Sequence, residues 1–463
     1  MKFLRQACCL IALLLCASAA RAQDTATFIG TVHDSSGATV AGAEVNVANP
    51  RIGINKVVTT NQDGEWVVPY LPIGSYDISV TAKGFKKYQA RGVALRVGQK
   101  ARVDVDLEVG SITSEVVVAG ENVAQVDTQS SEIGGTITGS EITQLQLNGR
   151  DFTQLVNLTP GVNNQTAQDE GTVGILGNVV YSINGGRGEN NNWEVDGGDN
   201  MDNGSNNSLN VFPSVDSIAE VRVLTSNYGA QYGRNASGTV ETEIKSGTSS
   251  FHGDVYEFNR NNIFNDRSYF DQSSPNAPEY KKNDFGYTIG GPIFIPGHYN
   301  TDKTKTFFFW SQEWRLERVP GSAWLSSQGD AANIPVPSVA ERGGNFSDVC
   351  PGPDCPVLPG GGTSIPSGSI GVNATALLAE IPQPNSTTGC PSPIGACYNT
   401  TFTQPTYWRE ELLRVDHNVT HNLRATFHYI HDSWNTVTPL TLWSNATVPN
   451  IQTKFVGDRK SVV

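Results

Sequence analysis

The sequence predicts a mainly β protein with three parts: a small β-sandwich, a loop-rich α+β domain and the first strands of a transmembrane antiparallel β-barrel that stays incomplete. Three features support this prediction. Short alternating strands separated by turn signals fill residues 26–109, and glycine and asparagine dominate the first half of residues 181–258. Long amphipathic strands begin after residue 250. Together these patterns are typical of an exported, β-rich protein.

The first 22 residues have the layout of a secretory signal peptide. Lys2 and Arg5 precede an apolar run over residues 7–20, and Ala20-Arg21-Ala22 forms the small-residue site expected before a cleavage point. We therefore expect residues 1–22 to be removed on export. No later stretch offers about 18 consecutive apolar residues, which argues against helical membrane spans.

Charge and motif content exclude several classes of function. The chain has 32 basic and 45 acidic residues and a formal net charge of −13, which argues against a nucleic-acid partner because such a partner needs a clustered basic face. Neither G-x-S-x-G nor H-E-x-x-H occurs, and the seven histidines form no persuasive metal motif. We expect no enzymatic activity, no metal site and no cofactor.

Residues 26–109 read as a self-contained sandwich with turn signals at residues 35–38, 61–64 and 71–74. The stretch GTVHDSSGATVAGAEVNV, followed by TTNQDGEWVVPYLPIGSYDISVTAKGFKKY, resembles the carboxypeptidase regulatory-like domain, a transthyretin-like sandwich also classed with carbohydrate-binding-like folds. The absence of an H-x-x-E pair predicts an accessory role and no peptidase activity. The alternating apolar positions predict a core of Phe28, Val45, Val47, Trp66, Tyr76, Ile78 and Val80.

Residues 122–247 carry several motifs in a specific order. These are ING.R at residues 183–187, EVDGGDN at 194–200, IAEVRVLTSNYGAQYGR at 218–234 and GTVETEIKSGT at 238–248. The series resembles the plug domain of TonB-dependent outer-membrane receptors, and LNGRDFTQLVNLTPGV at residues 147–162 resembles their Oar-like branch. Apolar spacing predicts short helices near residues 142–147 and 155–158, with strands at 219–225 and 238–245.

The aspartates of DGGDNMDNG invite a calcium interpretation, but the pattern fails the EF-hand test. Counted from Asp196, Gly198 stands at a ligand position and Asn207 replaces the closing glutamate. A tight turn is the preferred interpretation. Arg187 or Arg234 is expected to pair with barrel carboxylates, which would hold a polar plug inside a polar lumen.

The linker at residues 111–120 contains a short β-prone run, Glu115, Val116, Val117, Val118 and Ala119. In the family that the plug resembles, this position can hold the TonB box, an extended segment that offers its backbone to the edge of a periplasmic partner. An equally weighted alternative makes the run the last strand of the sandwich or the first strand of the plug.

Residues 250–463 are predicted to form the N-terminal part of the barrel, with a long extracellular loop at residues 320–405. Phe285, Tyr287 and Ile289 alternate with small or polar residues, and residues 423–429 repeat this alternation. We count about five convincing strands, whereas a closed bacterial barrel needs at least about eight and the resemblance implies about 22. The sequence is therefore expected to be a truncated reading of a longer protein.

Four cysteines remain after the signal peptide, and all lie in the Pro/Gly/Ser-rich part of the long loop. An even, local set in an exported chain predicts disulfides rather than a zinc site. The short spacings favour Cys350–Cys355 and Cys390–Cys397 among three connectivities.

The resemblance implies a receptor in the outer membrane of a Gram-negative bacterium. It would bind an extracellular oligosaccharide, peptide or metal chelate and import it with energy from a periplasmic TonB-type transducer. Trp193 and Asp196 are the candidate ligand contacts. The alternative is a surface adhesion or carbohydrate-binding protein that transports nothing.

Overall fold

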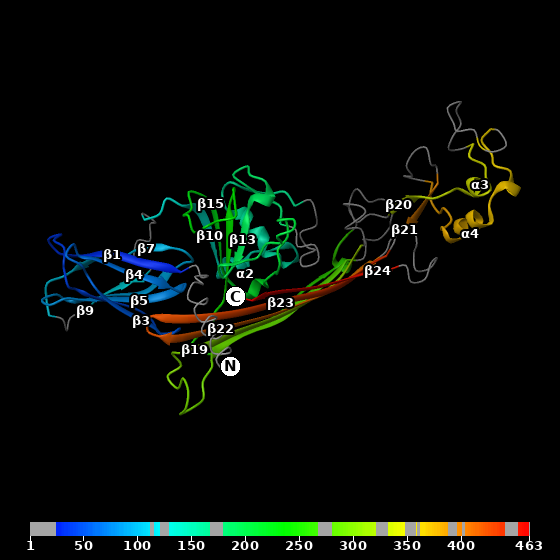
Figure 1. The fold of residues 1–463 in the computed structure, drawn as a ribbon. Coiled ribbons are helices and arrows are strands. Elements are labelled where there is room, and N and C mark those ends of the chain that lie inside the picture. Colours follow the sequence, from blue (N-terminus) through cyan, green and yellow to red (C-terminus); the bar gives the residue numbers. More distant parts are fainter. Residues whose placement is uncertain are drawn as a thin grey trace, which may run out of the picture.

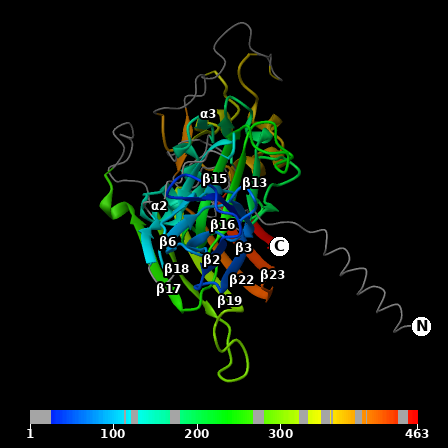
Figure 2. The same ribbon diagram turned by 90° about the vertical axis from the view of Figure 1, so that its left-hand side faces the viewer.

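The computed structural model describes residues 25–111, 115–120, 129–166, 179–266, 280–320, 332–347, 358, 362–387, 396–400, 403–439 and 452–462. The expected signal peptide lies outside these residues. A sandwich lies at one end, a plug lies beside it, and a sheet of long strands passes beneath both (Figure 1). From the sandwich end, these strands are seen to curve around the plug (Figure 2). No helix in the described ranges is long and apolar enough to cross a membrane.

The sandwich packs a four-stranded sheet against a five-stranded sheet. In the first, β4, β1 and β7 follow in that order and β8 also pairs with β1; the second has the order β3-β2-β5-β6-β9. The strands are β1 (Ala26–Asp34), β2 (Glu44–Asn49), β3 (Ile54–Thr59), β4 (Glu65–Leu71), β5 (Gly74–Thr81), β6 (Lys87–Leu95), β7 (Lys100–Arg102), β8 (Val105–Leu107) and β9 (Glu115–Ala119). Every core residue predicted from the alternation is buried, because successive strand residues point to opposite faces.

The plug is built on a mixed sheet of order β10-β15-β16-β13-β14 beside the two-stranded sheet β11-β12. Its elements are β10 (Ile133–Thr138), α2 (Gly139–Gln144), η2 (Asn148–Arg150), η3 (Phe152–Leu158), β11 (Val162–Asn164), β12 (Tyr181–Ile183), η4 (Gly188–Asn190), β13 (Asn192–Val195), β14 (Gly198–Asp199), η5 (Val215–Ser217), β15 (Ile218–Ser226) and β16 (Thr239–Ile244). The expected plug strands correspond to β15 and β16, and the expected short helices to α2 and η3. All six residues of β16 are buried, so this strand lies at the centre of the plug.

Six long antiparallel strands form the barrel sheet, in the order β17-β18-β19-β22-β23-β24. They are β17 (His252–Asn261), β18 (Lys281–Pro292), β19 (Thr306–Pro320), β22 (Thr403–Thr420), β23 (Leu423–Pro439) and β24 (Gln452–Val462). Tyr287 and Ile289 are exposed on the outer face, whereas Thr288 between them is buried toward the plug. The described strands form an open sheet with β17 and β24 at its edges, as expected for an incomplete barrel.

Short elements occupy the connections at the end of the strands away from the sandwich. They are η6 (Asn262–Phe264), β20 (Ala332–Pro335), α3 (Val339–Arg342), η7 (Ser367–Ser369), α4 (Val372–Glu380) and β21 (Cys397–Thr400). Figure 1 places β20, β21, α3 and α4 at the far end of the long strands. The tight connection between β22 and β23 lies at the sandwich end, where Asn418 contacts the sandwich. The connections therefore separate into long and short ones at opposite ends of the sheet.

Candidate functional site

A two-residue turn after β13 presents Asp196 to the barrel sheet. Val195 pairs with Gly198 across the hairpin of β13 and β14, so Asp196 and Gly197 form its turn. Both residues have positive φ, 47° and 74°, which a type I′ turn requires and Asp-Gly pairs favour. The tight turn predicted here is therefore present, and it carries a carboxylate at its tip.

Asp196 joins the plug to two neighbouring barrel strands. Its Oδ1 atom accepts a hydrogen bond from the Ile244 amide at 2.9 Å and lies 3.2 Å from a guanidinium nitrogen of Arg414. Its Oδ2 atom lies 2.8 Å from Nδ1 of His428. Arg414 on β22 and His428 on β23 are direct register partners. Because both point inward, they meet the plug carboxylate from adjacent positions.

A second carboxylate extends the contact on the barrel side. Asp416 accepts from the Ser246 hydroxyl of the plug at 2.6 Å and from the Thr426 hydroxyl at 2.8 Å. It also pairs with Arg414 at 3.1 Å and with Arg424 at 3.3 Å. We call Asp196, Glu243, Arg414, Asp416, Arg424 and His428 the charge cluster. Its members come from three strands and one turn, so it forms only when plug and barrel sheet are together.

Burial determines how strongly the charge cluster holds the plug. The side chains of Asp196 and Asp416 are at most 2% exposed, and that of Arg414 is 5% exposed. Buried ions are costly unless they are paired, and removal of one partner typically costs about 3–5 kcal/mol. Burial alone would raise the pKa of Asp196, but the Arg414 charge and the His428 hydrogen bond hold this pKa below its ordinary value. Asp196 is thus held as an anion.

The lowered pKa of Asp196 predicts where acid should loosen the plug. Its contribution to stability is fully present above the ordinary aspartate pKa of 3.8 and is lost as the pH falls through the lower, folded-state value. For the full-length protein, we expect the contribution of Asp196 to plug stability to be present at pH 5 and to decrease below pH 3.8. Denaturant titrations of the wild type and Asp196→Asn check this. A difference in unfolding free energy between the two proteins that disappears between pH 8 and pH 5 would contradict this expectation.

Arg150 makes a separate contact between the plug and the edge of the barrel sheet. Its guanidinium lies 4.1 Å from the ring centroid of Phe258 and 4.9 Å from that of Tyr256, both on β17. It also pairs with Asp216 of the plug. A cation over an aromatic face is attracted by the ring quadrupole. Arg150 therefore connects the plug to β17, the strand at one edge of the barrel sheet, whereas the barrel members of the charge cluster lie on β22 and β23.

An apolar contact joins the same two bodies. Trp408 on β22 is 2% exposed and belongs to the hydrophobic core of the plug, with Trp193 and Phe212. The Phe212 amide donates to Asp432 of β23 at 2.8 Å. Arg315 of β19 stacks over the Trp408 ring at 4.4 Å. The plug and the inner face of the barrel sheet thus share one continuous packed interior.

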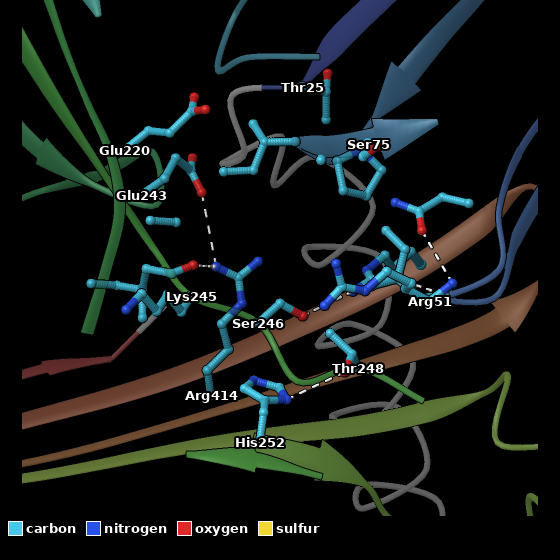
Figure 3. A pocket seen from close by; sticks show the side chains of 18 residues that line it. Thr25, Arg51, Ser75, Glu220, Glu243, Lys245, Ser246, Thr248, His252 and Arg414 are labelled. Carbon is cyan, nitrogen blue, oxygen red and sulfur yellow. Dashed lines mark hydrogen bonds and ion pairs between the residues drawn. The ribbon is translucent and has the colours of Figure 1, made fainter. Parts of the chain in front are cut away.

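A cavity of about 320 Å³ lies where sandwich, plug and barrel sheet meet. Arg51 and Ser75 of the sandwich line one side, and Glu243 and Lys245 of the plug line another. Figure 3 shows Arg414 rising from the barrel sheet between Glu243 and Lys245. Three members of the charge cluster, Glu243, Arg414 and Arg424, therefore form part of the wall of this cavity.

The two predicted ligand contacts take up structural positions. Trp193 is 1% exposed and packs against Tyr181 at 5.8 Å between ring centroids. Asp196 is 2% exposed and faces Arg414 and His428. Both side chains are enclosed by protein in the described structure, and their role as ligand contacts stays a prediction. Glycine- and asparagine-rich motifs mark turns. Their sequence alone does not tell whether another part of the protein packs against a turn and buries its side chains.

The candidate TonB box is paired with the sandwich. Residues Glu115, Val116, Val117, Val118 and Ala119 form β9, which runs parallel to β6 from Lys87 to Arg91. This arrangement matches the alternative in which the run is the last strand of the sandwich. One edge of β9 remains unpaired among the described strands, because β9 ends the sheet order. Its role as a TonB box stays a prediction.

Of the four predicted disulfide cysteines, only Cys397 lies within the described residues. Cys397 is disulfide-bonded, and it is fully buried at the start of β21. Cys350, Cys355 and Cys390 lie outside the described residues. The connectivity Cys350–Cys355 and Cys390–Cys397 therefore stays a prediction.

Other charged groups of the plug differ from expectation. Arg234 pairs with Asp199 inside the plug, and no barrel carboxylate contacts Arg187 or Arg234 within the described ranges. In the charge cluster the arrangement is reversed, since the plug supplies the carboxylate Asp196 and the barrel sheet supplies Arg414 and His428. In the part of the chain that the structure describes, no group of three or more His, Cys, Asp or Glu residues is placed to hold a metal ion.

Comparison with known families identifies two parts of the chain. Residues 27–108 match the carboxypeptidase regulatory-like domain, and residues 243–462 match an outer membrane beta barrel domain. The C-terminal part of the chain is therefore similar to an outer membrane β-barrel domain, and the sandwich is similar to a carboxypeptidase regulatory-like domain. The chain is similar to the TonB-dependent transporter Oar of Myxococcus xanthus, with 28% identity over 314 residues. This alignment covers 64% of the chain and 27% of Oar, so the chain spans about a quarter of the length of this relative.

Solved structures with a similar arrangement include two outer-membrane proteins. The transporter YddB of Escherichia coli has a TM-score of 0.35 and 11% identity, covering 66% of this chain and 37% of YddB. The siderophore receptor PirA of Acinetobacter baumannii has a TM-score of 0.34 and 14% identity, covering 71% of this chain and 44% of PirA. The two domain matches and the similarity to Oar agree with the resemblances predicted from the sequence, and they confirm the predicted Gram-negative outer-membrane location.

Sequence reasoning missed the barrel half of the charge cluster. Arg424 and His428 lie on the polar face of the strand that the alternation over residues 423–429 identified, and Arg414 and Asp416 lie on the neighbouring strand β22. Ionisable residues on the inner face of barrel strands are a usable signal, since such positions face either water or a plug. The pattern marks these residues as inward-facing, but it does not choose their partners.

Proposed function

We propose that this protein is an outer-membrane transporter whose plug closes a barrel and is moved by a periplasmic TonB-type energy transducer. The observation that carries the proposal is the attachment of the plug to the inner barrel face by the charge cluster. The homology to Oar supports the same class of function. The ligand is expected to be an oligosaccharide, a peptide or a metal chelate, and no catalytic step is proposed.

The energetics of the charge cluster explain why such a plug needs external work. Withdrawing Asp196 would leave Arg414 and His428 without their plug partner in a buried site. Loss of one buried partner costs about 3–5 kcal/mol, and the shared core around Trp408 adds to that cost. Thermal opening is therefore rare, and a mechanical pull on the chain N-terminal to the plug supplies the missing work.

The position of the sandwich favours transport over surface adhesion. The sandwich lies at the end of the strands opposite the cysteine-bearing segment (Figure 1). With that segment outside the cell, the sandwich is in the periplasm, where it cannot bind a surface ligand. Trp66, an aromatic that a carbohydrate site could use, is 2% exposed in its core.

The proposed transducer contact is strand addition at β9. We expect Val117→Pro in the full-length protein to weaken binding of a purified TonB-type C-terminal domain at least about tenfold, because proline removes a backbone donor and distorts the strand. Val117→Ala is the matched control and should bind like the wild type, since strand addition relies on the backbone. Calorimetric titration measures both affinities. Equal affinities for all three proteins would exclude β9 as the TonB box.

A further inference from the structure

A loop of the sandwich is seated between two turns of the barrel sheet. Residues 49–53 run from the end of β2 to the start of β3. They lie against the connection between β18 and β19 and against the end of β22. The amide of Ser249, just before β17, donates to the Arg51 carbonyl at 2.7 Å. We call residues 49–53 the docking loop. The docking loop makes these contacts with its backbone. Because its backbone is continuous with β2 and β3, the contacts form only when the sandwich as a whole is held in this position.

Asn418 bridges the docking loop and the barrel. Its side-chain amide nitrogen donates to the Ile52 carbonyl at 2.9 Å and to the Thr304 carbonyl at 2.8 Å. Asn418 is itself held by Arg424, whose guanidinium donates to its Oδ1 atom at 3.2 Å. One side chain near the end of β22 thus joins the sandwich to the connection between β18 and β19.

Arg424 connects the docking loop to the charge cluster. One guanidinium nitrogen lies 3.5 Å from the Ile52 carbonyl, and the other lies 3.4 Å from Ser246 of the plug and 3.3 Å from Asp416. The same residue therefore contacts sandwich, plug and barrel sheet. Displacing the docking loop removes a partner from a residue that also holds the plug.

Gly53 allows the close approach at this junction. An added Cβ atom at Gly53 would lie 1.9 Å from the Thr304 carbonyl oxygen, and Gly53 has a φ of 67°. Lys56 adds a polar contact nearby, with its ammonium 3.0 Å from Oδ1 of Asn422 and also on the His421 carbonyl. Only glycine fits between the two surfaces, so the docking is sensitive to a single methyl group.

The sandwich also touches the plug directly. The Val97 amide donates to Oε2 of Glu220 on β15 at 2.9 Å. An added Cβ at Gly98 would meet the Arg222 guanidinium at 1.8 Å. The cavity of about 320 Å³ described above lies between these contacts and the docking loop (Figure 3). The sandwich is therefore held to the plug and to the barrel sheet by two separate sets of contacts.

We propose that the sandwich restrains the plug by docking on the barrel turns through residues 49–53. We call the sandwich in this docked position the bolt. The biological role of this restraint rests on the transport function proposed above. The restraint itself can be measured without any transport. Release of the docking loop precedes plug movement. Because β9 is both an edge strand of the sandwich and the candidate contact for the transducer, a pull on β9 acts on the bolt first.

Two glycine variants test the bolt. Gly53→Ala and Gly37→Ala both place a side chain at positive φ, at 67° and 82°, but a Cβ at Gly37 meets nothing within 4 Å. Both variants therefore carry similar backbone strain in the sandwich, and only Gly53→Ala clashes with the barrel. Docking is measured in the full-length protein by disulfide formation between Arg51→Cys and Ser249→Cys, which are neighbours through their backbone hydrogen bond.

The expected result is selective loosening of the plug. Cross-linking should fall at least about fivefold in Gly53→Ala and stay at the wild-type level in Gly37→Ala. Hydrogen exchange of β15 and of residues 245–250 should rise at least about tenfold in Gly53→Ala alone, because amide exchange in the native state reports local opening. In the protein that carries only Arg51→Cys and Ser249→Cys, oxidation of the cysteine pair should protect the same amides from exchange at least as well as in the wild type.

Two outcomes would overturn the bolt. One is lost cross-linking in Gly53→Ala with unchanged exchange in the plug, which means that the sandwich docks without restraining anything. The other is unchanged cross-linking in Gly53→Ala, which means that the docking loop is not the contact. Neither outcome bears on transport, whereas failure of the transducer titration at β9 leaves this exchange experiment intact.

Discussion

Asp196→Asn is expected to lower the free energy of unfolding of the plug by about 3 kcal/mol. The amide keeps the size of the carboxylate but loses the charge that Arg414 and His428 surround. Arg414 retains Asp416 and Glu243 as partners, so the loss falls at the lower end of the range for breaking a buried pair. Denaturant unfolding of the full-length protein in detergent, followed by tryptophan fluorescence, measures the change.

Asp199→Asn is the matched control for this experiment. Asp199 lies on the same hairpin, but its partner Arg234 is 53% exposed, and surface pairs of this kind contribute about 0–1 kcal/mol. We expect less than about 1 kcal/mol for the control. Equal losses for the two variants would show that the hairpin, and not the charge cluster, determines the attachment of the plug.

Trp193→Ala is expected to destabilise the plug by about 3–5 kcal/mol. The indole is 1% exposed and packs in the plug core with Tyr181, so truncation opens a large cavity beside β16. Thermal unfolding of the full-length protein, recorded by near-ultraviolet circular dichroism, checks the size of the effect. A ligand contact at an open site would instead leave the unfolding transition unchanged.

Trp193→Phe separates packing from hydrogen bonding at the same position. The indole nitrogen of Trp193 has no hydrogen-bond partner among the described residues, so its loss removes no bond. Phenylalanine keeps an aromatic ring against Tyr181, and we expect a loss of about 1–2 kcal/mol. If Trp193→Phe destabilised the plug as much as Trp193→Ala, packing of the aromatic ring would not explain the loss of stability.

Local patterns predicted much of the fold because each depends on near neighbours in the chain. The alternation in residues 26–109 predicted a core that includes Phe28 and Trp66, both of which are buried. Asp196-Gly197 predicted a tight turn, because positive φ is a local requirement. The alternation of Tyr287 and Ile289 with Thr288 predicted which face of β18 points outward. In each case the side-chain direction follows from the period of the strand.

The candidate site depended on contacts that no local pattern contains. Asp196 and Arg414 are separated by 218 positions in the chain, and β-branched runs such as β9 suit either a sandwich edge or an extended free segment. The burial of Trp193 and Asp196 was missed for the same reason, since burial depends on what packs against a turn.

The sequence by itself determined the order of the three bodies, their strands, the Asp-Gly turn and the family to which they point, because periodicity and turn chemistry are local properties. Only the tertiary structure decided that Asp196 meets Arg414 and His428, that β9 pairs with β6, and that residues 49–53 dock on the barrel turns. These contacts join segments distant in the chain, and their partners are selected by shape and charge once the bodies pack together.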